Sequence, residues 1–330
     1  MLHLNVSGTH YEAGFQCGSW LKARGCGSEA AFVFPRERRD YALAALKVYE
    51  REYPEMIDEI RGLAEGLEAD FMLLSTFLLG MYAYNALNFC TCAAMAAADG
   101  HTLFGRNSDF LTALEPGYGS YFYRLKGCHG FIGTTTAFAE MEDGVNDAGL
   151  AVGLTYVYSP EKAPGLNSGM LVRRLLERCA TLEECLDSLE GLTVGSSQTL
   201  TIADRGGAMA VVECSPRERA VIRPADRPFV CTTNHFNRLK SSVVPPAEED
   251  MFSARRYETA RKALSEQAVY DVDFLKDLLS GKKGFMCQYD RRKGGDTVWS
   301  VICDLTGGEL LRCEGNPSRG PFERDVRMIF

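Results

Sequence analysis

The sequence predicts an α+β fold in which antiparallel sheets are covered by helices. Apolar residues recur at helical spacing through most of residues 1–89, and the pattern changes to short strands at Cys90. From there the strands come in hairpins and the helices in pairs, with little strand–helix–strand alternation. The 330 residues suffice for one large domain or two ordinary ones. We therefore divide the chain into a mostly helical leader segment, residues 1–89, and a catalytic segment, residues 90–330.

The leader segment is predicted to begin with a strand over residues 2–6 and a helix that Ser7 or Thr9 caps. Further helices are expected over residues 35–68, with a break near Pro54, and over residues 71–84. Eight strands of the catalytic segment are expected over residues 120–125, 131–138, 149–157, 198–203, 208–214, 229–232, 298–304 and 309–313. Its helices are expected over residues 171–178, 182–189, 254–266 and 273–279.

Composition excludes several classes of partner. The net charge of −8 argues against nucleic acid or an anionic membrane surface. No apolar run reaches the roughly 18 residues that span a bilayer. The twelve cysteines are scattered, apart from Cys90-x-Cys92, so we expect no metal site. Residues 1–12 lack the features of a signal peptide, so buried free thiols in the cytoplasm are the simplest interpretation. A homo-oligomer stays open.

One stretch, residues 90–110, concentrates the polar residues that can carry chemistry. The dipeptide Asp99-Gly100 predicts a two-residue turn with positive φ at both positions. A hairpin folded there returns the second strand alongside the first, which brings Arg106 and Asp109 near Cys90. A thiol, a guanidinium and a carboxylate thus meet at one strand end.

The spacing of these residues resembles that of a known family. Cys90-Thr91, Asp99-Gly100 and Gly105-Arg106-Asn107-x-Asp109 are similar to the linear-amide group of N-terminal nucleophile (Ntn) hydrolases. Gly8, Tyr11, Glu12, Gly14 and Gly18 also resemble the leader of its isopenicillin N acyltransferase-like branch. The resemblance implies a four-layer αββα sandwich, cleavage before Cys90, and no cofactor. It also implies that the leader stays bound after cleavage, and that the substrate is a small N-acyl amide.

The resemblance further implies roles for individual residues. Cleavage frees the α-amine of Cys90, which then acts as base for its own thiol. Asp109 would orient this amine, and Arg106 would favour the thiolate. Asn234, in Thr233-Asn234, matches the oxyanion asparagine of the family. Arg256 matches a supporting arginine, although Arg255 beside it leaves open which of the two points inward.

Substrate contacts are expected from Thr155 and Tyr156, which stand where the family often has asparagine in a strand. Tyr82 and Tyr84, upstream of Cys90, are expected at the entrance of the site. Tyr118, Tyr121 and Tyr123 are expected to face the same cavity. Such walls would favour an apolar acyl group.

Three other interpretations stay open. An acyltransferase would share the Cys90 thioester and pass the acyl group to an amine instead of water. His235 lies at about the papain-like interval after Cys90, which fits a Cys-His protease. A non-catalytic binding protein is the third, because Phe89 is bulky for the position before such a cysteine.

Overall fold

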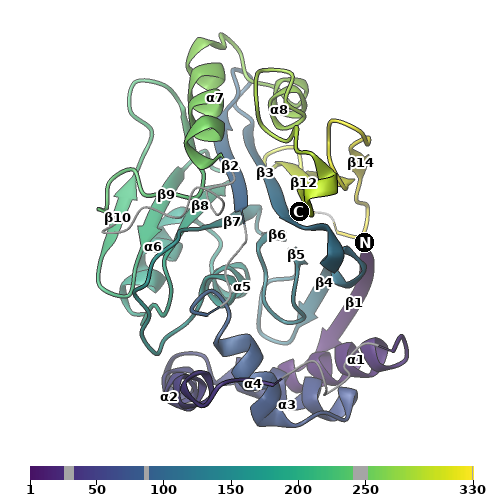
Figure 1. Ribbon diagram of the computed structural model, residues 1–330. Helices are drawn as coiled ribbons and strands as arrows, with labels where there is room; N and C mark the ends of the chain where they lie inside the picture. The colour runs from purple at the N-terminus through teal and green to yellow at the C-terminus, as the bar shows by residue number, and fades with distance from the viewer. Residues whose placement is uncertain (26–32, 85–88, 241–251, 329) are drawn as a thin grey trace.

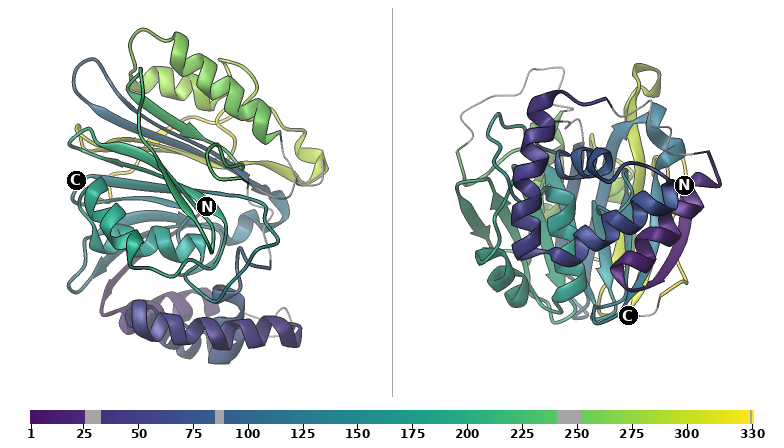
Figure 2. Two further views of the ribbon diagram at one scale, coloured as in Figure 1. Left: turned by 90° about the vertical axis from the view of Figure 1, so that its left-hand side faces the viewer. Right: turned by 90° about the horizontal axis from the view of Figure 1, so that it is seen from below.

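A computed structural model of the chain describes residues 1–25, 33–84, 89–240, 252–328 and 330. Two stacked sheets form its centre, and helices cover both outer faces (Figure 1). The side view in Figure 2 shows α7 and α8 above the sheets, and the helices α1 to α6 below them. The predicted four-layer αββα sandwich is therefore confirmed. Within the described residues, no helix has both the length and the apolar character needed to cross a membrane.

The eight-stranded sheet has the order β1-β4-β5-β6-β7-β8-β9-β10. Strand β1 pairs parallel with β4, and every other pair in this sheet is antiparallel. The leader segment thus supplies the edge strand of a sheet that otherwise belongs to the catalytic segment. The strands are β1 (Leu2–Gly8), β4 (Gly119–Leu125), β5 (Phe131–Thr135), β6 (Asp143–Asn146), β7 (Leu150–Tyr156), β8 (Gln198–Asp204), β9 (Met209–Cys214) and β10 (Arg219–Ile222).

The six-stranded sheet has the order β11-β2-β3-β12-β13-β14 and is antiparallel throughout. An apolar core that includes Phe104, Ile132 and Trp299 fills the space between the two sheets. The hairpin β2–β3 therefore lies in the middle of the molecule, with both faces covered. The strands are β2 (Phe89–Ala96), β3 (Thr102–Leu111), β11 (Phe229–Thr232), β12 (Gly295–Asp304), β13 (Glu309–Glu314) and β14 (Glu323–Arg324).

Helices cover the outer faces unequally. Helices α5 (Ser168–Arg178) and α6 (Leu182–Glu190) pack on the eight-stranded sheet, and α7 (Ser253–Glu266) and α8 (Val272–Leu279) pack on the six-stranded sheet. The four leader helices lie together on the α5 side, as the view from below shows (Figure 2). They are α1 (His10–Lys22), α2 (Arg36–Glu52), α3 (Pro54–Leu67) and α4 (Phe71–Leu79). Two short 3-10 helices are η2 (Thr112–Gly117) and η4 (Arg291–Lys293).

Glycines allow α1 and α3 to pack backbone against backbone. A Cβ atom on Gly14 would lie 2.0 Å from the Glu59 carbonyl oxygen, and one on Gly62 would lie 2.0 Å from the Tyr11 carbonyl oxygen. Such distances are far inside van der Waals contact, so only glycine fits at this crossing. Thr9 caps α1 in a capping box with Glu12, as its sequence predicts.

Some predicted boundaries are wrong. Asp99 does not take a positive φ, and Ala97 N–H donates to the His101 carbonyl, so the β2–β3 loop is longer than two residues. Helix α4 ends at Leu79, and Tyr82 has φ 58° in the turn that follows. Strand β5 ends at Thr135. The short strands β6, β10 and β14 were not predicted, because two to four residues carry too little periodicity.

Candidate active site

The β2–β3 hairpin brings the Cys90 thiol and the Arg106 guanidinium together. Cys90 pairs with Ser108 across the strands and Arg106 pairs with Cys92, so Cys90 and Arg106 are diagonal neighbours on one face. The Nη2 atom of Arg106 donates to Cys90 Sγ over 2.7 Å, and both side chains are fully buried. The structure thus joins the two groups as the hairpin predicts.

Arg106 is fixed by groups of the opposite sheet. Its Nη1 donates to Asp143 Oδ2 over 2.7 Å, its Nη2 to Glu142 Oε2 over 3.0 Å, and its Nε to the Leu154 carbonyl oxygen over 2.9 Å. Gly153 makes room, because a Cβ atom there would lie 3.0 Å from Arg106 Cδ. Two carboxylates therefore compensate the buried guanidinium, as burial of a charge requires.

Asn234 and Arg256 hold the backbone of Cys90. The Cys90 N–H donates to Asn234 Oδ1 over 2.9 Å, and Arg256 Nη1 donates to the Cys90 carbonyl oxygen over 2.5 Å. Arg256 Nη2 also donates to Asn234 Oδ1, and Asn234 Nδ2 donates to the Tyr156 carbonyl oxygen, both over 2.8 Å. Arg256 is buried in α7, whereas Arg255 is exposed and lies over the Phe285 ring. Arg256 is therefore the arginine that points inward.

Asp109 lies on the opposite face of β3 from Arg106. The Thr297 and Tyr289 hydroxyls donate to its carboxylate over 2.5 and 2.8 Å, and Arg256 Nη1 lies 3.7 Å from it. Burial raises the pKa of Asp109, and Arg256 acts against that rise. Asp109 thus joins the cluster through Arg256, and its role towards the amine of Cys90 stays a prediction.

Burial disfavours ionisation of the Cys90 thiol in this arrangement. Burial raises the pKa of Cys90 well above its usual value, although Arg106 acts in the opposite direction. Phe89 precedes it in β2 and is itself buried. A thiolate nucleophile therefore requires the site to open or a base to come close.

The four expected substrate-binding residues lie in three different environments. Thr155 donates to the Thr233 carbonyl oxygen over 2.5 Å, next to Asn234 in sequence, so it positions the strand end that carries Asn234. The Tyr156 ring lies 6.2 Å from the Tyr82 ring in the core on the helix side. Tyr84 donates to Glu37 on α2, so its hydroxyl faces the leader helices.

Tyr121 and Tyr123 belong to the same apolar core as Tyr82, whereas Tyr118 does not. Both lie in the core on the helix side of the eight-stranded sheet. The Tyr123 ring stacks on Phe131 with centroids 4.9 Å apart and carries the Arg173 guanidinium 3.8 Å from its centroid. Tyr118 packs on Trp299 inside the core between the sheets. Tyr118 is thus separated from the other tyrosines, and an apolar acyl pocket formed by Tyr82, Tyr121 and Tyr123 stays a prediction.

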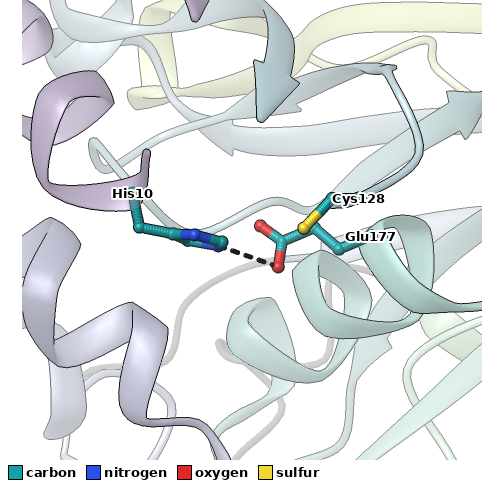
Figure 3. Close-up of side chains that lie close together, drawn as sticks. All are labelled: His10, Cys128 and Glu177. Carbon is teal, nitrogen blue, oxygen red and sulfur yellow. Dashed lines mark hydrogen bonds and ion pairs between the residues drawn. The ribbon is translucent and has the colours of Figure 1, made fainter. Parts of the chain in front are cut away.

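Three potential metal ligands lie close together away from Cys90. The ligand atoms of His10, Cys128 and Glu177 lie within 4.8 Å of one another (Figure 3). However, Glu177 already accepts hydrogen bonds from the Tyr53 hydroxyl and from Arg173 Nε, each over 2.6 Å. Burial also raises the pKa of Cys128 to about 11, whereas a metal binds the thiolate. We therefore interpret the cluster as an ion network that joins α1 and α3 to α5.

Comparisons with known proteins agree with this geometry. Residues 96–319, more than half of the chain, match the family model of acyl-coenzyme A:6-aminopenicillanic acid acyl-transferase. The chain belongs to this family. The match includes Arg106, Asp109, Asn234 and Arg256 and begins after Cys90. The predicted membership of the Ntn hydrolases that act on linear amides, by hydrolysis or acyl transfer, is thereby confirmed.

Two solved structures show the same fold for this acyl-transferase family member, and a third shows a similarity only. An arginine-to-leucine variant of conjugated bile acid hydrolase from Clostridium perfringens has a TM-score of 0.51 at 14% identity, covering 72% of this chain and 96% of that chain. A cysteine-to-alanine mutant of the same hydrolase gives 0.50 at 14% identity, covering 72% and 97%. Penicillin V acylase from Agrobacterium tumefaciens gives 0.48 at 17% identity, covering 68% and 83%.

Several site residues were not found from the sequence of this acyl-transferase family member. Glu142 and Asp143, which fix Arg106, lie at the start of a strand too short to be predicted. Ser253, whose Oγ accepts from the Asn234 N–H over 2.9 Å, begins α7. The pair Glu142-Asp143 within a mostly apolar stretch was a usable signal, because adjacent buried acids need a cation.

Proposed function

We propose that the protein is a self-processing cysteine amidohydrolase that cleaves a linear amide of an N-acyl substrate through a Cys90 thioester. The observation that carries the proposal is the setting of Cys90. Its sulfur accepts from Arg106, while its backbone N–H and carbonyl are held by Asn234 and Arg256. A nucleophile whose backbone nitrogen has a specific polar partner suits a mechanism in which that nitrogen becomes a catalytic amine.

The first proposed step is cleavage of the Phe89–Cys90 peptide bond. Cys90 Sγ attacks the Phe89 carbonyl carbon, a C–S bond forms, and the C–N bond breaks as the nitrogen takes up the thiol proton. Water then hydrolyses the thioester, which leaves a Phe89 carboxylate and restores the thiol. The products are the two segments, residues 1–89 and 90–330.

The leader segment has the contacts to remain bound after this cut. Strand β1 pairs with β4 along its length, and Arg173 of α5 donates to both oxygens of Glu59 on α3. Asn167 Nδ2 donates to the Leu78 carbonyl oxygen over 2.7 Å. The leader and the catalytic segment also share one apolar core. Release of the leader would expose all of this surface.

The freed α-amine of Cys90 acts as the base in substrate cleavage. Its unperturbed pKa of about 8 lies near working pH, which suits proton transfer. The amine takes the thiol proton as sulfur attacks the amide carbon, and passes it to the leaving nitrogen. Asn234 Nδ2 supplies a hydrogen bond to the oxyanion. Water then attacks the thioester; attack by an amine instead would make the protein an acyltransferase.

The environment of His235 favours this mechanism over a Cys-His pair. Its Nδ1 lies 2.8 Å from Ser253 Oγ, and its ring meets Tyr257 edge-on. These contacts engage the imidazole with α7. The ten described cysteines other than Cys90 are free thiols, which suits a reducing compartment such as the cytoplasm.

The experiment that tests the proposal combines intact mass with an amide screen. Purified wild-type protein should give the masses of residues 1–89 and 90–330, and Cys90→Ala should stay one chain. A screen of N-acyl amides, with and without an added acceptor amine, should then separate hydrolysis from transfer. Activity in wild-type protein that remains a single chain after long incubation would refute the free-amine mechanism.

A further inference from the structure

A row of three buried polar side chains crosses the eight-stranded sheet towards Asn234. Thr155 of β7, Thr199 of β8 and Glu213 of β9 lie directly opposite one another on adjacent strands, so they share one face of the sheet. All three are fully buried. Strand β11, which leads into Asn234, packs against β8 and β9. The row therefore faces the strand end that carries the proposed oxyanion donor.

The two threonines of this row hold the chain that leads into Asn234. Thr155 Oγ1 donates to the Thr233 carbonyl oxygen over 2.5 Å, and the Thr199 hydroxyl lies 3.2 Å from the Thr232 hydroxyl. Strand β11 also pairs with β2 as far as Thr232. Side chains and a strand ladder thus fix the backbone on the near side of the donor.

Glu213 holds the chain that follows the donor. The backbone N–H groups of Asn237, Arg238 and Leu239 all donate to its carboxylate, those of Arg238 and Leu239 over 2.9 and 2.7 Å. Within the described part of the chain, residues 236–239 make no backbone-to-backbone hydrogen bond. The carboxylate therefore takes the place of a partner strand for this segment.

The segment needs such an anchor because an oxyanion donor acts only in the correct place. The donor must lie about 2.7–3.1 Å from the developing oxyanion, and a displacement of about 1 Å can cost about 10²-fold in rate. Asn234 is the second residue after β11 ends, so the sheet no longer fixes its backbone there. Its N–H donates to Ser253 Oγ over 2.9 Å, and the next fixed point along the chain is the segment that Glu213 binds.

We propose that Glu213 is a positioning residue for Asn234, which fixes the segment behind the oxyanion donor and so directs its amide at the reacting carbonyl. This inference rests on the proposed function. The hydrogen bonds of Glu213 go to the backbone of residues 237–239, so the residue acts through the place of Asn234 and takes no part in bond making.

The test is a double-mutant cycle on protein whose processing has been verified by mass. Glu213→Gln keeps the size of the side chain but replaces one accepting oxygen by a donor that faces a backbone N–H. Its kcat on the best amide should fall by about 10–100-fold, because a misplaced donor weakens the transition state, while KM should stay within about threefold. In Asn234→Asp, which lacks the donor, the same change should lower kcat by less than about twofold, because no donor is left to position.

Two further variants separate this role from general damage to the fold. Glu213→Asp keeps the carboxylate and should restore part of the kcat that Glu213→Gln loses. Glu218→Gln makes the same change of charge in the exposed turn after β9 and should leave kcat unchanged in both backgrounds.

Equal losses of kcat with and without the Asn234 donor would show that Glu213 acts independently of it and would overturn the inference, as would an unchanged kcat in folded Glu213→Gln. Should Glu213→Gln not fold, Glu213→Asp is compared in the two backgrounds by the same criterion. Failure of both variants to fold would show a structural role only and would also overturn the inference. These outcomes leave the proposed function intact, whereas a wild type that cleaves no amide refutes the proposed function and the inference with it.

Discussion

Replacement of Asn234 by aspartate removes the amide donor of this side chain and keeps its accepting oxygen. Asn234 Oδ1 accepts from the Cys90 N–H over 2.9 Å and from Arg256 Nη2 over 2.8 Å, and Nδ2 is the only side-chain donor. Aspartate keeps the accepting oxygen at nearly the same place and removes the N–H group. The variant therefore removes the proposed hydrogen bond to the transition state, together with the hydrogen bond to the Tyr156 carbonyl, and keeps the acceptor of the Cys90 N–H.

Loss of one oxyanion donor typically lowers kcat by about 10²–10³, or about 3–4 kcal/mol of activation free energy. We expect Asn234→Asp to show this loss. Arg256 compensates the new charge, but the Tyr156 carbonyl loses its donor, so the melting temperature should also fall. Asn234→Ala also removes the oxygen that binds Arg256 and Cys90. It should therefore lose about 1–3 kcal/mol of folding stability in addition to its activity.

The assay is kcat on the best amide from the screen, with protein whose processing has been verified by mass. His235→Ala is the matched control, since the imidazole lies one residue away and contacts Ser253. Its kcat should remain within about threefold of the wild-type value, because His235 is not one of the reacting groups. A loss larger in His235→Ala than in Asn234→Asp would refute the assignment and favour a Cys-His pair.

Three further predictions concern the leader segment, one within it and two at its interface with α5. Arg173→Met leaves Glu59 and Glu177 buried without their guanidinium and should lower the free energy of unfolding by about 3–5 kcal/mol in urea titration; a loss below about 1 kcal/mol would contradict the ion network. Gly62→Ala should destabilise by about 1–3 kcal/mol, although alanine normally favours a helix, because its Cβ meets the α1 backbone; a raised melting temperature would count against the close crossing. Although burial opposes it, Arg173 and then His10 hold the pKa of Glu177 at about 2, below its usual 4.5. A lowered folded-state pKa gives stability that is present above pH 4.5 and lost as pH falls towards 2, so Glu177→Gln should flatten the stability profile in that window.

The sequence predicts the β2–β3 hairpin well because its determinants are local. The change from helical to strand periodicity at Cys90 and the glycine at position 100 place two adjacent strands in antiparallel register. Arg106 is then a diagonal cross-strand neighbour of Cys90, whichever type of turn joins the two strands. The predicted turn geometry is wrong at Asp99, yet the pairing does not depend on it.

Contacts between the sheets could not be predicted in the same way. Both faces of each sheet are covered, so apolar residues occur on both sides of a strand and alternation does not reveal which face meets which layer. Tyr123 therefore could not be assigned to the helix side. Likewise, Asp143 reaches Arg106 across the interior from a separate sheet, and nothing local to either residue indicates the pair.

The parallel pairing of β1 with β4 affects the lifetime of the folded protein. Before the proposed cut, the two strands belong to one chain, and refolding after unfolding is a first-order process. After the cut they belong to two polypeptides, so reassembly of the eight-stranded sheet becomes second order and depends on protein concentration. Unfolding of the processed protein would then be hard to reverse. The lifetime of the processed protein would be set by its unfolding rate, because the two separated chains would reassemble slowly at cellular concentration.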